Sequence, residues 1–158
     1  MYAFYRHEPV FLVIEHDGKQ ISMIKFITEE KYWQHQALEL SDRFTNQIKQ
    51  ALDDFFSGID TKLELDYQIE GTEFEMQVWE KTKEIAFGQK ASYADIAKAI
   101  GNPEAVRAVG TALGKNHIPL IIPCHRIIGS DGELHGFAGG LEIKQFLLDH
   151  EAGIQGKK

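Results

Sequence analysis

Helix start and stop signals follow one another closely between residues 72 and 114, and they favour several short helices over one long element. Thr72-Glu73-Phe74-Glu75 is a capping-box pattern, in which a hydroxyl and a carboxylate each accept a bond from an otherwise unpaired backbone N–H. Ser92-Tyr93-Ala94-Asp95 opens a second helix, and Gly101 supplies its left-handed stop. Asn102 is expected to cap a third helix, with Pro103 at its first position. Two helices joined through Gly101-Asn102 predict a helix-turn-helix.

The third predicted helix has two contrasting faces. Val106, Val109 and Leu113 form one stripe, which is the natural core face. The other stripe combines Arg107 with the small residues Gly110, Thr111 and Gly114. A major-groove helix normally carries several long polar side chains that read base edges, whereas this stripe has only one. It therefore suits close approach to a nucleic-acid surface with one inserted side chain, although packing of the small residues on the first domain would explain it equally well.

The rest of the chain predicts an α/β protein of the α+β type. Residues 10–14 and 21–26 are rich in β-branched and aromatic side chains, and Asp17-Gly18 between them predicts a hairpin. Apolar residues recur at helical spacing from Leu40 to Phe56, with Gly58 as the stop, and residues 63–67 alternate like a short strand. Residues 129–140 are rich in turn formers and suit a small β wing. A last helix is expected from about 141 to 151, with a frayed tail over 152–158. We therefore predict two domains, 1–70 and 71–158.

Composition narrows the functional class. The chain has a single cysteine, Cys124, which excludes an intramolecular disulfide and any zinc site with two or more cysteines. Three of the histidines, His7, His16 and His35, are scattered without ligand spacing, so we predict no metal. No apolar run reaches the roughly 18–20 residues of a membrane span, and the first residues lack a signal-peptide pattern. The expectation is a soluble cytoplasmic protein.

The overall charge of −7 argues at first against a nucleic-acid partner. Residues 1–70, however, carry 7 basic and 13 acidic side chains, and therefore hold most of the negative charge. Residues 86–130 carry five basic and two acidic side chains, so this stretch is mildly basic. The acidity of the chain consequently does not exclude DNA binding by the second domain.

Cys124 lies in an otherwise apolar stretch and is followed by His125 and Arg126. An ordinary thiol has a pKa near ~8.5 and needs help to ionise at neutral pH, and a histidine base needs a partner that orients it. Adjacent residues of a strand point to opposite faces, so contact between Cys124 and His125 does not follow from the sequence. His150 and Glu151 are both candidates for the orienting partner.

The sequence resembles a known family in three motifs. Residues 122–127 (Ile-Pro-Cys-His-Arg-Ile), residues 102–110 before them and residues 136–141 after them resemble the O6-alkylguanine-DNA alkyltransferases, also called methylated-DNA–protein-cysteine methyltransferases. The match runs in order from Gly71 to Glu151. It implies a ribonuclease H-like N-terminal domain followed by a winged helix-turn-helix domain that binds DNA in the minor groove.

The resemblance assigns the chemistry to five residues. Cys124 would accept the alkyl group from O6 of guanine, His125 would act as its base through a water, and Glu151 would orient His125. Asn116 would hold the turn before the active-site strand. Tyr93 would donate a proton toward N3 of the departing guanine and push its phosphate as the nucleotide flips out.

The resemblance also implies a DNA surface and a guanine pocket. Arg107 would fill the gap left in the base stack. The other DNA contacts would come from Tyr93, Asn102, Ala105, Val106, Gly114 and Ser130. The pocket would be lined by Cys124, Ile127, Phe137 and Ala138. Phe137 stands where many relatives have tyrosine, so Tyr93 has to supply the phenol.

These residues imply a DNA repair protein that acts once. A thioether does not hydrolyse, and no second cysteine can remove the alkyl group, so the reaction is stoichiometric and needs no cofactor. The expected partner is double-stranded DNA containing O6-alkylguanine, bound by a monomer, and O4-alkylthymine stays open as a further substrate.

Three other functions remain as alternatives. A lesion sensor that flips the base without accepting the group is opposed by Cys124, which such proteins lack. A helix-turn-helix regulator is opposed by the missing base-reading side chains and by the acidic first domain. A cysteine hydrolase would use Cys124 and His125 but gives no reason for the helix with Arg107.

Overall fold

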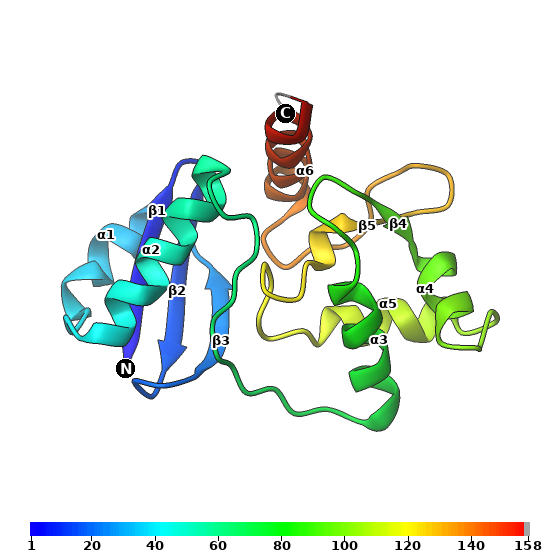
Figure 1. The fold of residues 1–158 in the computed structure, drawn as a ribbon, viewed down its shortest axis with the longest axis horizontal. Helices are drawn as coiled ribbons and strands as arrows, with labels where there is room; N and C mark the ends of the chain where they lie inside the picture. Colours follow the sequence, from blue (N-terminus) through cyan, green and yellow to red (C-terminus); the bar gives the residue numbers. More distant parts are fainter. Residues whose placement is uncertain (157–158) are drawn as a thin grey trace. The chain divides into compact units, whose positions relative to one another are not determined.

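The computed structural model describes the backbone of residues 1–156 and the side chains of residues 1–153. The chain divides into two compact units, Met1–Ile69 and Glu70–Lys158, and each is described by itself (Figure 1). The mixed α/β architecture agrees with the α+β class expected from the sequence.

The first unit contains a three-stranded antiparallel sheet in the order β1-β2-β3. The strands are β1 (Tyr2–His7), β2 (Val10–His16) and β3 (Ile21–Phe26). The predicted hairpin is confirmed as β2–β3, and Gly18 adopts the left-handed φ of 90° that its turn requires. Strand β1 was not predicted, although it pairs with β2 along its whole length. Residues 63–67 form no strand and contribute one bridge, between Ile21 and Tyr67.

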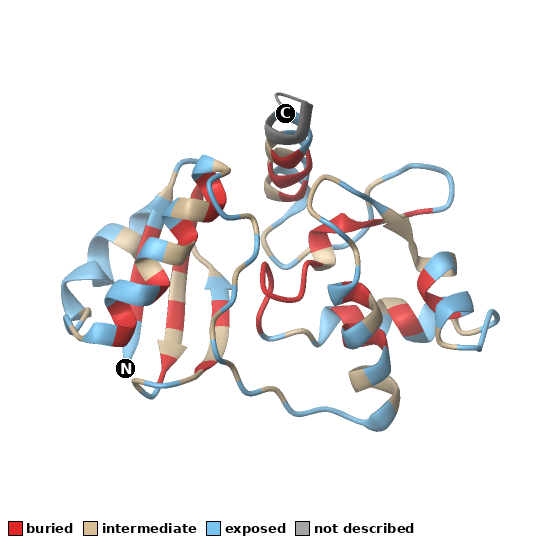
Figure 2. Cartoon of the chain, viewed as in Figure 1, coloured by how far each residue is buried: buried red, intermediate tan, exposed pale blue. Residues whose placement is uncertain are grey.

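Helix α2 (Arg43–Ser57) supplies most of the helical core of this unit and packs against β1. Asp42 caps its first turn, and Gly58 ends it with φ 76°, as predicted. Its buried face, drawn red in Figure 2, includes Ile48, Leu52 and Phe55. The prediction was wrong for Leu40, which precedes the helix and is 60% exposed. Two short helical segments not predicted, α1 (Glu29–His35) and η1 (Gln36–Leu38), lie between β3 and α2.

The second unit begins with three short helices, as the start and stop signals predicted. These are α3 (Glu73–Lys83), α4 (Tyr93–Ala99) and α5 (Val106–Gly114). Complete capping boxes form at Thr72 and at Ser92, and Gly101 has φ 80°. The indole N–H of Trp79 donates a 2.9 Å hydrogen bond to the carbonyl of Ala112, which joins α3 to α5 in the interior.

The start of α5 differs from the prediction. The helix begins at Val106, after a turn in which Ala105 N donates to Asn102 O, so Asn102 does not cap it and Pro103 precedes it. Val106 is thus the first residue of the helix and is 37% exposed, contrary to its expected place on the core face, while Val109 and Leu113 are buried as expected.

The remaining elements differ from the predicted wing and last helix. Strands β4 (Ala91–Ser92) and β5 (Ile127–Ile128) form a short parallel pair. Residues 129–140 form turns but no strand, so the expected β hairpin is absent from this stretch. Helix α6 (Leu141–Gly156) continues beyond residue 151, so residues 152–156 of the predicted frayed tail are helical. Residues 157–158 of that tail lie outside the described residues.

Candidate active site

Cys124 opens a short 3-10 helix, η2 (Cys124–Arg126), at the end of a buried segment. Figure 2 shows the run from residue 118 to 123 as continuously buried. Asn116 holds this segment at both ends, because its side chain accepts from Ile118 N at 2.9 Å and donates to Ile122 O at 3.1 Å. Within residues 1–156, Leu120 is the only non-glycine residue with a left-handed backbone, at φ 75°. Asn116 therefore stabilises a strained turn directly before the cysteine.

The environment of Cys124 opposes its ionisation in the free protein. The thiol is half-buried, and removal from water raises its pKa to about 11. A hydrogen bond from the Asn116 side chain and the positive charge of Lys144 act in the opposite direction and lower the pKa. Cys124 is consequently protonated at neutral pH and needs a base before it can act as a nucleophile.

His125 and Glu151 form a buried hydrogen-bonded pair. His125 Nε2 contacts Glu151 Oε2, and Arg126 donates to both carboxylate oxygens, from Nε at 2.8 Å and from Nη2 at 3.1 Å. Gly88 N adds a 3.0 Å bond to Glu151 Oε1. Burial by itself would raise the pKa of Glu151, but the hydrogen bond with His125 and the hydrogen bonds and positive charge of Arg126 outweigh it and lower the pKa to about 2. Glu151, and not His150, is thus the partner of His125, whereas the His150 ring stacks on Phe146.

The protonation of His125 follows from these contacts. Burial lowers the pKa of His125 more than Glu151 raises it, so the imidazole is neutral at pH 7. An ionised carboxylate only accepts hydrogen bonds, so the single ring proton sits on Nε2. The lone pair is then on Nδ1, which is buried and has no hydrogen-bond partner among the described residues. His125 therefore has an unused acceptor next in sequence to the cysteine.

Tyr93 lies at the first position of α4 and is electrostatically coupled to the cysteine. Burial raises the pKa of its hydroxyl, and the negative charge that Cys124 acquires on ionisation raises it further. The Tyr93 ring meets the His135 ring edge-on at a centroid distance of 6.3 Å. Its phenol remains a proton donor well into the alkaline range.

The residues expected to contact DNA lie mainly on α5 and the turn before it. Asn102, Val106, Arg107 and Gly114 are exposed, and Ala105 is half-buried. A side chain added at Gly114 would meet no atom within 4 Å, so the helix presents open space there. This part of α5 is therefore accessible, and it carries no side chain at Gly114.

The expected pocket residues follow Cys124 along the chain. Ile127 is buried in β5, Ser130 and Ala138 are exposed in the loop, and Phe137 is half-buried there. The described interactions of Cys124 involve Asn116, Tyr93 and Lys144, and none of these loop residues. Their role in lining a guanine pocket therefore stays a prediction.

Two residues of the site were not assigned from the sequence. Arg126 was noted beside Cys124 without a role, and it neutralises Glu151. Lys144 was missed, although a lysine in the otherwise apolar stripe of a helix, one turn before Leu147 and Leu148, is a recognisable signal.

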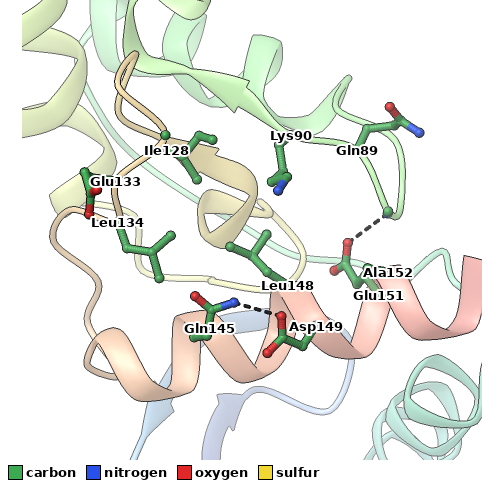
Figure 3. Close-up of a pocket in the computed structure, with 12 residues that line it drawn as sticks. Gln89, Lys90, Ile128, Glu133, Leu134, Gln145, Leu148, Asp149, Glu151 and Ala152 are labelled. Carbon is green, nitrogen blue, oxygen red and sulfur yellow. Dashed lines mark hydrogen bonds between the residues drawn. The ribbon is translucent and has the colours of Figure 1, made fainter.

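A cavity of about 240 Å³ lies beside α6, and Glu151 forms part of its wall (Figure 3). Glu151 stays only 1% exposed because its carboxylate is turned toward the loop at Gly88. The other polar groups on the wall include Gln145 and Asp149, which bond to each other at 2.8 Å.

The described part of the chain holds no cluster of three or more potential metal-ligating side chains. No helix in this part is both long and apolar enough to cross a membrane.

Comparisons with known proteins place these features in a family. The family described as "6-O-methylguanine DNA methyltransferase, DNA binding domain" matches residues 73–153. A methylated-DNA–protein-cysteine methyltransferase of Haemophilus influenzae is 39% identical over 95% of this chain and 85% of its own. The crystal structure of Mycobacterium tuberculosis O6-methylguanine methyltransferase aligns with TM-score 0.82 and 32% identity, covering 96% of this chain and 92% of that one.

A second structure of the M. tuberculosis protein, in complex with DNA, aligns with TM-score 0.81 and 31% identity over 97% of this chain and 93% of that one. The family match covers all the residues of the Cys124 site, and the relatives extend over nearly the whole chain. This chain belongs to the methylated-DNA–protein-cysteine methyltransferase family.

Proposed function

We propose that this protein repairs DNA directly, by moving the alkyl group of O6-alkylguanine in double-stranded DNA to Sγ of Cys124. The observation that carries the proposal is the half-buried Cys124 next in sequence to a buried, neutral His125 whose Nδ1 has no partner among the described residues. The family membership supports it, and so does the DNA complex of the similar M. tuberculosis protein.

The transfer is one displacement at the alkyl carbon. Sγ of the Cys124 thiolate forms the new S–C bond while the C–O6 bond breaks, and the bonding electron pair leaves with the guanine. The thiol proton goes first to His125 Nδ1, directly or through one water. Tyr93 donates a proton toward N3 of the departing guanine, and the proton that His125 took from the thiol then replaces the one lost by Tyr93. The overall reaction converts a thiol and an alkylguanine into a thioether and guanine.

Glu151 makes His125 an effective base. It fixes the proton on Nε2 and stabilises the imidazolium that forms when Nδ1 takes the thiol proton. The bond to Glu151 also fixes the orientation of the imidazole ring, and solvent does not compete for this bond because His125 and Glu151 are both buried. Asn116 contributes by holding the turn through its bonds to Ile118 N and Ile122 O, and it lowers the pKa of Cys124.

We further propose that α4 and α5 act as a helix-turn-helix that binds the minor groove. Its exposed small residues allow close approach, and Arg107 inserts where the flipped nucleotide leaves the stack. Asn102, Ala105, Val106, Gly114 and Ser130 then lie along the DNA. The extruded guanine is received by Ile127, Phe137 and Ala138, without the additional phenol that a tyrosine at residue 137 would supply.

Each molecule is proposed to react once. A thioether is stable in water, and Cys124 is the only cysteine in the chain, so no second thiol can accept the group. The product is therefore a protein permanently alkylated at one residue.

The test is to mix the protein with a duplex containing one O6-methylguanine and to measure both products. We expect one added methyl mass on the peptide with Cys124 and one repaired guanine per protein molecule. Cys124→Ser is the matched control and should yield neither. Repaired DNA beside unmodified Cys124, or several repaired guanines per molecule, would overturn the mechanism. Tight lesion binding without transfer would support the alternative of a lesion sensor.

A further inference from the structure

Lys144 is a lysine in the interior of the second unit, where burial lowers the pKa of its ammonium group and a negative charge on Cys124 would raise it. It is 0% exposed on α6, and its Nζ donates a 2.8 Å hydrogen bond to the carbonyl of His135. Nζ also lies 6.0 Å from the centre of the Tyr93 ring. Among the residues with described side chains, no carboxylate is within ion-pair distance of this ammonium group. A buried ammonium without an anion is unfavourable, so its presence calls for an explanation.

The position of Lys144 on α6 relates it to the active site. Lys144 and Glu151 are seven residues apart, which places them two turns apart on the same face of the helix. This face packs against η2, the segment that carries the cysteine. Glu151 bonds to His125 there, while Lys144 acts electrostatically on Cys124. One face of α6 thus supplies a carboxylate that bonds to His125 and an ammonium group that acts on Cys124.

The other charges near Cys124 cancel or are absent. On η2 and α6, Arg126 and Glu151 form an ion pair with two hydrogen bonds, which leaves no net charge. His125 on η2 is neutral because burial lowers its pKa. Among the buried side chains of these two elements, only Lys144 contributes an uncompensated charge.

The group that faces the cysteine from α4 adds no positive charge either. Tyr93 is neutral at pH 7, because burial and Cys124 both raise the pKa of its hydroxyl. Asn116 donates a hydrogen bond but carries no charge. Cys124 is then the one group coupled to Lys144 that can become an anion.

We propose that Lys144 is the counter-cation of the Cys124 thiolate: its buried ammonium favours the charged form of Sγ and so promotes the attack on the alkyl carbon. This role of Lys144 rests on the function proposed above, because it promotes alkyl transfer only if Cys124 is the residue that accepts the alkyl group. Lys144 acts on the reacting sulfur by its field, and the hydrogen bond to His135 O holds the ammonium in place.

Because the chain has one cysteine, its ionisation can be followed without interference from other thiols. The experiment measures the rate of Cys124 alkylation by iodoacetamide from pH 7 to pH 10, below the thiol pKa of about 11, where the rate rises with the thiolate fraction. Lys144→Met should move this rate profile upward by about one pH unit, so that alkylation at pH 8 is about tenfold slower. Lys144→Arg, which keeps the charge, should recover most of the shift. Lys98→Met, which removes an exposed lysine of α4, is the matched control and should leave the profile in place.

A purely structural role for Lys144 makes different predictions. If the bond to His135 O were its whole purpose, Lys144→Met would lower the unfolding midpoint in urea and leave the pH profile unchanged, and that result would overturn the proposal. We expect equal or greater stability, because the variant buries no unpaired charge. If Lys144→Met does not fold, Lys144→Gln, which retains a donor for His135 O, must show the same upward shift or the proposal fails.

The assay separates this inference from the proposed function, because iodoacetamide reacts without DNA. An upward shift in Lys144→Met supports the counter-cation role even if the wild-type protein fails to repair O6-methylguanine. An unchanged profile beside normal repair would overturn the counter-cation role alone.

Discussion

Arg126 and Glu151 are joined by two hydrogen bonds, Nε to Oε1 at 2.8 Å and Nη2 to Oε2 at 3.1 Å, in the interior of the second unit. Arg126 adds a 2.8 Å bond from Nη1 to the carbonyl of Ile85. The guanidinium thereby neutralises the carboxylate that orients His125. Because of this neutralisation, Glu151 can be ionised and buried while His125 stays neutral and able to accept a proton.

The first prediction concerns this ion pair. Arg126→Met leaves the Glu151 carboxylate buried without its main compensating charge, and removal of one partner of a buried pair typically costs about 3–5 kcal/mol. Urea unfolding followed by circular dichroism measures the loss. Arg6→Met, which removes an exposed arginine with a 3.8 Å contact to Glu8, is the control and should change stability by less than about 1 kcal/mol. A loss below about 1 kcal/mol in Arg126→Met would contradict the buried pair.

The second prediction concerns the pH dependence of stability. The pKa of Glu151 is depressed to about 2 in the folded protein, below its ordinary value of 4.5. A depressed carboxyl pKa stabilises the folded state above the unfolded pKa, and this contribution is lost as the pH falls from about 4.5 to about 2.

The measurement is the free energy of unfolding between pH 6 and pH 2.5 for the wild type and for Glu151→Gln. We expect the wild type to lose stability more steeply below pH 4.5, by up to about 3 kcal/mol relative to the variant. Parallel curves for the two proteins would show that Glu151 does not titrate as described.

The third prediction concerns Tyr93. Tyr93→Phe removes a proton donor while keeping the ring that faces His135. Methyl transfer from duplex O6-methylguanine should slow by about 100-fold, which is the lower end of general acid catalysis, whereas alkylation of Cys124 by iodoacetamide should change little. The two rates are measured by mass spectrometry on the same protein preparation. Equal slowing of both reactions would mean that Tyr93 acts on the thiol and not on the leaving guanine.

The fourth prediction concerns Arg107, which is exposed on α5. Arg107→Ala should slow repair of a duplex at least tenfold more than it slows reaction with free O6-benzylguanine, because only the duplex requires base flipping. Lys98→Ala removes one exposed positive charge from α4 and serves as the control for loss of general DNA attraction. If both substrates slow equally, Arg107 does not occupy the stack.

Much of the local structure could be predicted because its determinants lie within a few residues of one another. The caps at Thr72 and Ser92 and the left-handed stops at Gly58 and Gly101 all form as expected. Each depends on one side chain and the backbone three or four positions away, or on the freedom of a glycine.

Prediction failed where distant packing selects between local options. The strand over residues 2–7 exists because β2 offers it a partner along its whole length. Val106 fits an apolar stripe, but α5 begins later than its capping signals suggest, and Val106 at its first position is exposed. Residues 129–140 have the turn formers of a wing yet form no strand.

The sequence by itself determined which residue is the candidate nucleophile, since the only thiol stands in a motif with an adjacent histidine. The tertiary structure decided which distant residues serve it. His150 and Glu151 were equal candidates until α6 packed Glu151 against His125, and Lys144 gained a role only through the same packing. The physical reason is that charge interactions depend on distance and burial, and residues 20 to 30 positions apart acquire both only when the chain is folded.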